Sequence, residues 1–425
     1  MPELRQVTAL HVGASTVLAL ALALPLPAQF SSRAEEIQAA RERKARTLQP
    51  DVLAKPERTL LNLKDNKVLE RLSAGVGGFR LKLGGLVTGG GFALGPEYLR
   101  RDIRDGSFFF RASAQASTRR YQQLEIELGS PGLVRNRLYF DLFAARHDYP
   151  AMNYYGPGPD SDKGGRSSFR REGLEFESLV GVRVLPRLSW GVSTAYLTFN
   201  TGPGSDRRLI STEQAFTPDR VPGLDHQTDF IRAATFVRYD SRDNPGGPRS
   251  GGLYLAQLSS YSDRTLKLHD FQRLDIELQQ YLPLFNKRRV FALRGKTAIT
   301  LNDRPGSVPF YLQPVLGGSD DLRGFRPFRF YDRNLIVLNG EYRWEAFSGL
   351  DMALFVDGGK VFAHRSNWNF RNLEGSAGFG LRFNIRNSTF LRTDVGFSHE
   401  GFQVWIKFND VFGGGSGTAA SPRVR

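Results

Sequence analysis

The chain has 425 residues, of which 40% are hydrophobic and 12% aromatic, and this composition is too apolar for an intrinsically disordered protein. It contains no cysteine and only six histidines, which lack helical ligand spacing, so we expect neither disulfides nor a metal or cofactor site. The formal charge of +15 comes from Lys and Arg scattered along the chain rather than clustered, which argues against a nucleic-acid partner.

The N-terminal residues indicate export. After Arg5, residues 15–25 form a short apolar run, which Pro25 and Pro27 interrupt. A membrane-spanning helix needs about 20 such residues, so the run better fits the apolar region of a signal peptide, predicted here for residues 1–28. A buried helix is the alternative interpretation of the same run.

Residues 29–75 are predicted to form a short periplasmic segment of helix and linker. The stretch 31–48 is rich in helix-forming residues, and Ser32 with Glu35 fits a capping box at its start. Residues 57–75 have room for a second short helix. The whole segment is about 47 residues long, which leaves little room for a folded domain with its own core.

Beyond this segment, apolar and polar residues alternate with a period of two. Within residues 377–386, for example, Leu381 and Phe383 fall on one face, whereas Arg382 and Asn384 fall on the other. A helical period of 3.6 fails there, so these segments are expected to be strands with one apolar and one polar face. About sixteen strands are predicted, with approximate spans 79–87, 90–99, 107–117, 119–129, 137–149, 167–185, 188–201, 230–242, 251–263, 271–284, 288–301, 336–346, 350–362, 374–386, 389–400 and 402–412.

The predicted strands fit a transmembrane barrel that occupies residues 76–412, followed by a flexible tail, residues 413–425. Many strands approach the roughly 9–11 residues that a tilted membrane strand needs, and an even number suits a bacterial outer-membrane barrel. The connections after strands six, ten, twelve and fourteen are short, whereas those after strands five, seven and eleven are long. A soluble β-sandwich does not predict this alternation.

The width of such a barrel determines which face meets the membrane. About sixteen strands enclose a space too wide for side chains to fill. The apolar faces are therefore expected to meet lipid, and the charged faces to line a wet lumen. The sequence thus predicts an all-β fold, a transmembrane antiparallel β-barrel of about 16 strands, with a short helical N-terminal segment.

The connection after strand eleven ends in the segment Gly317–Asn334, which carries four arginines and suits a loop inserted into a charged lumen. Alternation in the flanking strands turns Glu341 and Asp357 inward. Arg323 is therefore expected to reach both carboxylates, which match its planar guanidinium. A solvated loop arginine is the alternative, and the ion network could serve only to hold the loop and stabilise the barrel.

The two residues after Arg323 complete this predicted lumen-loop site. Gly324 permits a tight turn of the backbone, and Phe325 is expected to pack under the loop. The paired Asp320 and Asp321 earlier in the loop are attributed to solvation rather than to acid–base chemistry.

Two further motifs are candidate sites. Residues 240–251 are predicted to form a periplasmic turn, for which a plain turn and a functional site are both open interpretations. Its motif residues are Asp240, Arg242, Asp243 and Pro245. The last predicted strand is similar to an outer-membrane assembly signal, although thirteen residues follow it. Its signal residues are Phe402, Phe408 and Phe412.

Three motifs together resemble one known family. They are LRGF in residues 322–325, FVDGG in residues 355–359 and DSRDNPGGPRSG in residues 240–251. The combination resembles the bacterial surface-antigen domain, the barrel of the BamA/TamA-like outer-membrane assembly and translocation superfamily. The resemblance covers about residues 75–412. It implies that the loop arginine, here Arg323, pairs with acidic residues on strands twelve and thirteen.

The resemblance implies a barrel in the bacterial outer membrane that assists insertion or translocation of proteins or lipids. The partners implied are outer-membrane lipids and lipopolysaccharide, outer-membrane protein clients and a separate periplasmic partner, because the N-terminal segment is too short for a POTRA module. A weak seam between the first and last strands is the expected mechanism. Five glycines make the first hairpin a poor pairing edge, namely Gly84, Gly85, Gly89, Gly90 and Gly91. The alternative is a passive pore or structural barrel. No G-x-S-x-G, P-loop or H-E-x-x-H motif occurs, so enzyme activity is not expected.

Overall fold

The computed structural model describes residues 37–39, 41–43, 76–302, 304, 306–385, 388–408 and 412. The chain divides into two compact units, Met1–Arg58 and Thr59–Arg425. In the first unit, the described residues are helical and fall within the predicted helix. The predicted signal peptide, most of the predicted 29–75 segment and the tail lie outside the described residues. Within the described ranges, no helix is both long and apolar enough to cross a membrane.

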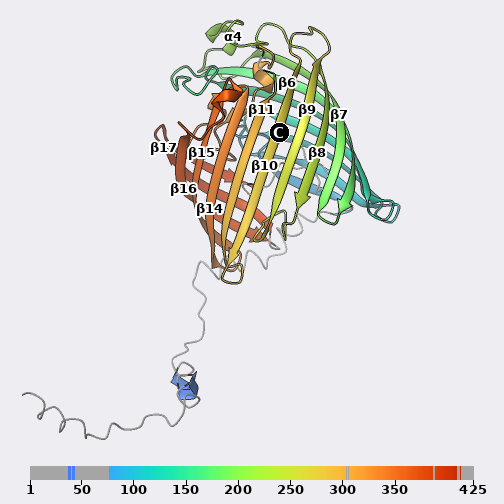
Figure 1. The fold of residues 1–425 in the computed structure, drawn as a ribbon, viewed down its shortest axis with the longest axis vertical. Helices are drawn as coiled ribbons and strands as arrows, with labels where there is room; N and C mark the ends of the chain where they lie inside the picture. The colour runs from blue at the N-terminus through green and yellow to red at the C-terminus, as the bar shows by residue number, and fades with distance from the viewer. Residues whose placement is uncertain are drawn as a thin grey trace, which may run out of the picture. The chain divides into compact units, whose positions relative to one another are not determined.

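Sixteen antiparallel strands form one sheet, in which every strand pairs with its neighbours along the chain (Figure 1). The strands are β1 Phe79–Gly84, β2 Ala93–Ile103, β3 Phe108–Ser117, β4 Gln122–Leu133, β5 Leu138–Tyr154, β6 Ser167–Leu185, β7 Leu188–Pro203, β8 Phe230–Asp240, β9 Gly251–Asp263, β10 Phe271–Leu284, β11 Arg289–Thr300, β14 Asn334–Phe347, β15 Leu350–Phe362, β16 Glu374–Ile385, β17 Ser388–Ser398 and β18 Gly401–Lys407. The barrel is nearly closed rather than fully closed, because among the described residues no ladder of hydrogen bonds joins β18 to β1. The predicted sixteen-stranded antiparallel barrel is confirmed.

The connections carry the few remaining elements. The connection between β11 and β14 contains a two-stranded sheet, whereas the helical turns are only three or four residues long. These elements are β12 Val315–Leu316, β13 Phe330–Tyr331, α4 Thr212–Ala215, η1 Phe310–Leu312 and η2 Arg365–Asn367.

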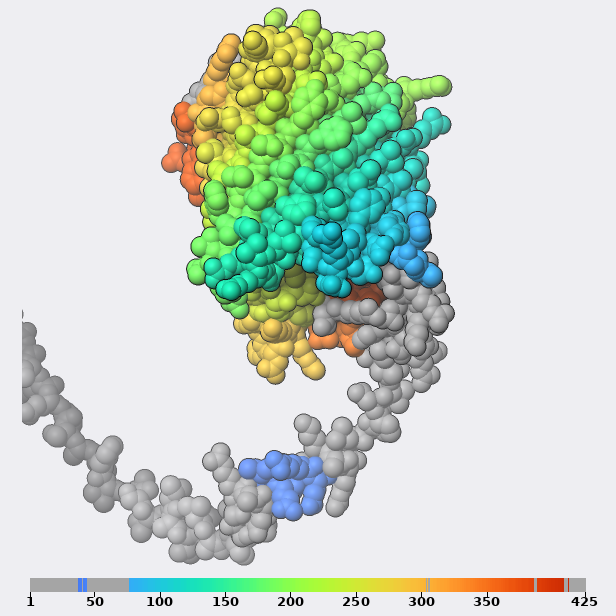
Figure 2. All heavy atoms as spheres, turned by 90° about the vertical axis from the view of Figure 1, so that its right-hand side faces the viewer, coloured from blue at the N-terminus to red at the C-terminus, as the bar shows by residue number. Residues whose placement is uncertain are grey.

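The barrel wall is apolar outside and charged inside. On β15, Leu354 and Val356 are 52% and 61% exposed on the outer face. Phe355 and Asp357, which alternate with them on the inner face, are 3% and 4% exposed. The same alternation runs along other strands, such as β8, and Figure 2 shows the outer wall over the strands drawn in teal and green. A soluble protein has the reverse arrangement, so this wall is built to face lipid.

Many predicted strand ends differ from the structure by a few residues; the fifth strand, for example, was predicted to end at residue 149 but continues to Tyr154. Two of the differences have a clear physical reason. β1 stops at Gly84, which has a φ of 146°, and the following Leu86 packs against interior hydrophobic residues instead of extending the strand. The last strand was predicted to reach Phe412 but ends at Lys407. Phe412 is 2% exposed and packs in a cluster with inward-facing residues of β10 and β11. Burial of this ring therefore outweighs continued strand pairing.

Aromatic residues fill the interior toward the end of the barrel where the long connections lie. The ring of Tyr154, at the end of β5, lies 5.5 Å from that of Phe310 and 4.8 Å from that of Tyr331, both from the connection between β11 and β14. Val221 and Leu224, from the connection between β7 and β8, join the same cluster. Two long connections are thus held to the wall by a shared hydrophobic core.

Candidate functional site on the charged face of the barrel

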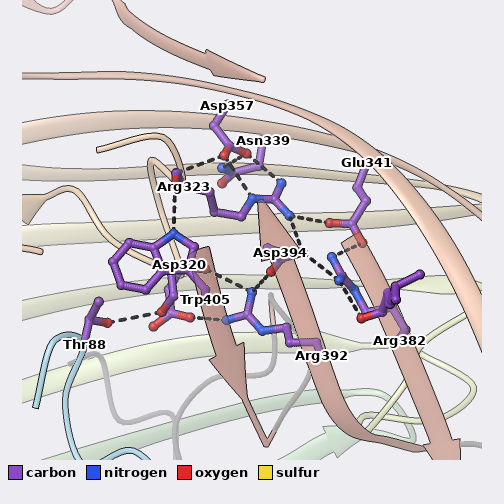
Figure 3. Close-up of polar contacts among 12 residues, drawn as sticks. Thr88, Asp320, Arg323, Asn339, Glu341, Asp357, Arg382, Arg392, Asp394 and Trp405 are labelled. Carbon is purple, nitrogen blue, oxygen red and sulfur yellow. Dashed lines mark hydrogen bonds and ion pairs between the residues drawn. The ribbon is translucent and has the colours of Figure 1, made fainter. Parts of the chain in front are cut away.

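Arg323 is the centre of the site and is fully buried. Its guanidinium binds Asp357 of β15 through two parallel hydrogen bonds, with Nη2 2.7 Å from Oδ1 and Nε 2.9 Å from Oδ2. Its Nη1 donates to Oε2 of Glu341 on β14 at 2.6 Å, and its guanidinium carbon lies 3.4 Å from the ring centroid of Phe355. The structure therefore brings these predicted partners together (Figure 3).

Glu341 joins Arg323 to two further arginines. Its Oε1 accepts from Nε of Arg343 at 2.7 Å and from Nη2 of Arg382, on β16, at 2.9 Å. Glu341 is only 2% exposed. A single carboxylate thus takes hydrogen bonds from three guanidinium groups in a site that water hardly reaches, and such charge-assisted bonds are strong.

Asp394 on β17 extends the network toward the last strands. It pairs with Arg382 at 2.7 Å and with Arg392 at 2.9 Å. Arg392 also binds Asp320 of the loop at 2.6 Å. In this ion-paired cluster four arginines face four carboxylates, and the Lys407 ammonium also lies near Asp320. The members of the cluster are Arg323, Arg343, Arg382, Arg392, Asp320, Glu341, Asp357 and Asp394.

The residues after Arg323 fit closely against the last strands. A Cβ on Gly324 would lie 2.6 Å from the carbonyl oxygen of Phe397, so only glycine fits there. Phe325 is fully buried, with its ring 5.5 Å from that of Phe330. Trp405 of β18 donates from Nε1 to the carbonyl oxygen of Arg323 at 2.7 Å. The Arg-Gly-Phe turn is therefore bound to β14, β15, β17 and β18.

The same segment also contacts the first strands, through fewer and mainly neutral bonds. The hydroxyl oxygen of Thr88, in the connection between β1 and β2, lies 3.2 Å from the hydroxyl oxygen of Ser319. Tyr331 donates to the carbonyl oxygen of Asn153 at 3.0 Å. Arg329 donates to Ser161 at 2.8 Å and pairs with Glu400 near β18 at 2.7 Å.

The predicted turn between β8 and β9 reaches other strands. Its Arg249 pairs with Asp351 at the start of β15, with Nη2 2.6 Å from Oδ2. The backbone N–H of Thr389, in β17, donates to the carbonyl oxygen of Gly246 at 2.9 Å. The turn thus bridges strands that are not neighbours in the sheet.

The predicted motif residues of this turn hold its local shape. Asp240 accepts from Arg242, with Nη2 2.9 Å from Oδ2, and Pro245 is exposed. Burial alone would raise the pKa of Asp243, but the backbone N–H groups of Arg249 and Ser250 and the Lys287 ammonium lower it to about 2.

The structure separates the three predicted assembly-signal residues. Phe402 is 64% exposed on the outer face of β18. Phe408 follows the strand, with its ring 5.6 Å from that of Phe92 and 5.7 Å from that of Phe390. Phe412 lies inside, where Gln279 donates to its carbonyl oxygen at 2.9 Å. The expectation of one continuous alternating strand through Phe412 is therefore wrong.

Several contacts of the cluster were missed from the sequence. Arg382 was expected on the charged inner face, but its pairing with Glu341 and Asp394 was not predicted. Asp394 also lies on a predicted strand, and alternation was the only available signal for it. Asp320 was attributed to solvation, yet it pairs with Arg392, and Asp321 lies 3.0 Å from Arg294. The described residues contain no group of three or more potential metal ligands.

A nearly closed sixteen-stranded sheet with an apolar outer wall and a charged inner face defines a transmembrane β-barrel of the bacterial outer membrane. Residues 108–408 match the Omp85 superfamily domain. This match covers most of the chain, which therefore belongs to the Omp85 superfamily. At the family level, membership implies insertion or translocation of proteins at the outer membrane.

Solved structures share the fold. BamA from Haemophilus ducreyi lacking POTRA domains 1–3 is similar with a TM-score of 0.58 and 14% identity, over 78% of this chain and 69% of that chain. CdiB from Escherichia coli is similar with a TM-score of 0.55 and 11% identity, over 79% of this chain and 63% of that chain. This chain thus spans less than two thirds of that CdiB. The sequence matches none of the curated proteins compared.

Proposed function

We propose that this protein inserts or translocates other proteins at the outer membrane through the seam between β1 and β18. The single observation that carries the proposal is that, within the part of the chain that the structure describes, no ladder joins these two strands, in a sheet where every other neighbouring pair is hydrogen-bonded. An unpaired strand edge offers its N–H and C=O groups to a strand of another chain. Clients are outer-membrane proteins, and a separate periplasmic chain delivers them.

The contacts on either side of the seam support this proposal. The inward charges of the first strands pair among themselves, as in Lys82 with Glu125 at 2.6 Å. The Arg323 cluster joins β14 to β17, and Trp405 adds β18. The described contacts between the first strands and the β14–β18 group include the pair of rings of Phe92 and Phe408. The loop segment of residues 317–334 also links the two groups, through bonds such as those of Ser319 with Thr88 and of Tyr331 with Asn153, but these bonds are fewer and mainly neutral. The seam is therefore more weakly held than the ion-paired strands on either side of it.

We propose that the Arg323 cluster holds the segment Gly317–Asn334 inside the barrel as a lock. In this role Arg323 acts on no client. It fixes β18 in position, so that only the seam has freedom to open. The buried, paired charges support this role, because removing one partner leaves an uncompensated charge.

A disulfide across the seam tests the proposal. A Cβ on Gly84 would lie 3.9 Å from the Cβ of Phe408, within the range of about 3.5–4.5 Å for disulfides. The chain has no native cysteine, so the double variant Gly84→Cys/Phe408→Cys forms one defined bond. The measurement is the abundance of other barrels in the outer-membrane fraction of cells that rely on each variant.

The oxidised double variant should fold, yet lose client assembly, and reduction should restore it. Each single-cysteine variant should keep its activity, which controls for strain at Gly84. Full activity with the seam closed in every molecule would refute the seam as the route. An unchanged abundance of other barrels in cells that lack the protein would instead leave a passive or structural barrel as the better account.

A further inference from the structure

An apolar groove of about 550 Å³ crosses the outer face of the barrel over β10, β11, β14 and β15. These strands run side by side at the front of Figure 1. Leucine and valine residues line most of the groove together with glycines, and Tyr254 of β9 and Gln280 of β10 also border it. The main lining residues are Leu278, Leu293, Leu338, Val356, Gly295 and Gly340.

The groove exists because Gly340 leaves a gap between larger neighbours. Gly340 pairs with Leu293 on β11 and with Val356 on β15, and both neighbours are exposed on the outer face. A Cβ on Gly340 would lie 3.5 Å from Cγ2 of Val356 and 3.9 Å from Cδ2 of Leu293, which is ordinary contact. The gap therefore has room for added atoms.

The groove lies at membrane depth. Toward the end of the barrel with short turns, Phe291, Tyr342 and Trp344 form a row of rings, with centroid distances of 4.9 and 5.7 Å between successive rings. Such rings mark the membrane interface. An empty groove in lipid forfeits dispersion contacts on its lining, so an acyl chain that enters it gains contacts that a smooth wall does not offer.

The connection between β15 and β16, residues 363–373, covers the other end of the groove. Trp368 donates from Nε1 to Oγ1 of Thr297 at 3.3 Å, and Lys360 donates to Oδ1 of Asn369 at 2.7 Å. Leu373 reaches the groove, since its Cδ1 lies 3.7 Å from a Cβ built on Gly358. This connection therefore lies on the outer face, at the end of the barrel that carries the long connections.

The covering connection has the chemistry of an anionic-lipid contact. Trp368 and Phe370 form an exposed edge-to-face pair with a centroid distance of 5.5 Å. Arg365 and Arg371 are exposed beside them, and residues 363–373 contain no carboxylate. Aromatic rings suit the boundary between acyl chains and headgroups, and each arginine near an anionic surface contributes about 1 kcal/mol of attraction.

We propose that this groove binds one acyl chain of a lipopolysaccharide molecule, whose lipid A phosphates lie against the connection of residues 363–373. The long connections of an outer-membrane barrel face the cell exterior, and this end therefore meets the leaflet that contains lipopolysaccharide. The site lies outside the barrel and apart from the seam, so it is independent of the proposed client route.

The test measures lipid A bound to the purified protein in detergent micelles by native mass spectrometry. The wild type should retain one lipid A. Gly340→Leu fills the groove and should weaken retention at least tenfold, whereas Ala233→Leu, on the outward face of β8, adds the same bulk elsewhere and should change nothing. Arg365→Gln and Arg371→Gln should each weaken retention about fivefold.

Folding is checked by the heat-modifiable migration of the barrel on gels. If Gly340→Leu fails to fold, Gly295→Leu replaces it, because a Cβ there meets only Leu338, at 3.9 Å. Equal retention of lipid A by a groove-filled variant would overturn the proposal. Equal retention of phosphatidylglycerol and lipid A would overturn the assignment to lipopolysaccharide. A dimer that the groove-filling variant abolishes would instead assign the groove to a second copy.

Discussion

Replacing Glu341 with glutamine should be among the most damaging single changes to the charged cluster. Glu341 accepts from Arg323, Arg343 and Arg382 and is 2% exposed. The change leaves four arginines facing three carboxylates, and breaking a buried ion pair costs about 3–5 kcal/mol. Asp357→Asn should cost less, because Asp357 has one arginine partner and Arg323 would keep Glu341.

The measurement is the free energy of unfolding in urea, for barrels folded in detergent micelles and followed by tryptophan fluorescence. Asp206→Asn is the control, since its pair with Arg208 lies at the surface and contributes little. The double variant Glu341→Gln/Arg382→Gln restores the charge balance and should recover part of the loss. A change below about 1 kcal/mol for Glu341→Gln, or strict additivity in the double variant, would refute the reasoning.

Three further outcomes follow from single contacts. The pKa of Asp243 is lowered to about 2, so the stability that its carboxylate gives to the turn of residues 241–250 should be complete above about pH 4 and lost as the pH falls toward 2. In the wild type, amide hydrogen exchange in this turn should therefore become faster over that pH range, relative to the rest of the barrel. In Asp243→Asn this acid-dependent increase should be absent. Phe412→Ala should lower the free energy of unfolding by about 3 kcal/mol, because it empties a buried aromatic site; an effect no larger than that of Phe408→Ala would contradict this packing. Arg323→Ala should raise ion conductance in planar bilayers above that of the intact protein, whereas a large, stable conductance in the intact protein would favour the passive pore.

The sixteen strands could be predicted because one face of each meets lipid. A lipid-facing row cannot slip by one residue without burying charge in the membrane, so the alternation in strands such as β16 is strict. The same alternation turned Glu341 and Asp357 inward and made their contact with Arg323 predictable. The face of the wall on which each side chain lies is thus a local property that the sequence alternation predicts well.

Contacts between distant strands could not be predicted in the same way. The pairing of Arg392 with Asp320 depends on the position of the loop relative to β17, and no periodicity encodes that position. The burial of Phe412 depends on a cluster with residues of β10 and β11. The bridge from Arg249 to Asp351 likewise requires the barrel's curvature, which places the turn between β8 and β9 near β15.

The most direct test of the central claim is depletion of this protein followed by quantitative mass spectrometry of the outer-membrane fraction. A protein that assembles or translocates clients through its seam should leave a selective set of outer-membrane proteins depleted, and the wild-type chain should restore them whereas the oxidised seam variant should not. An unchanged outer-membrane proteome after complete depletion would contradict the account.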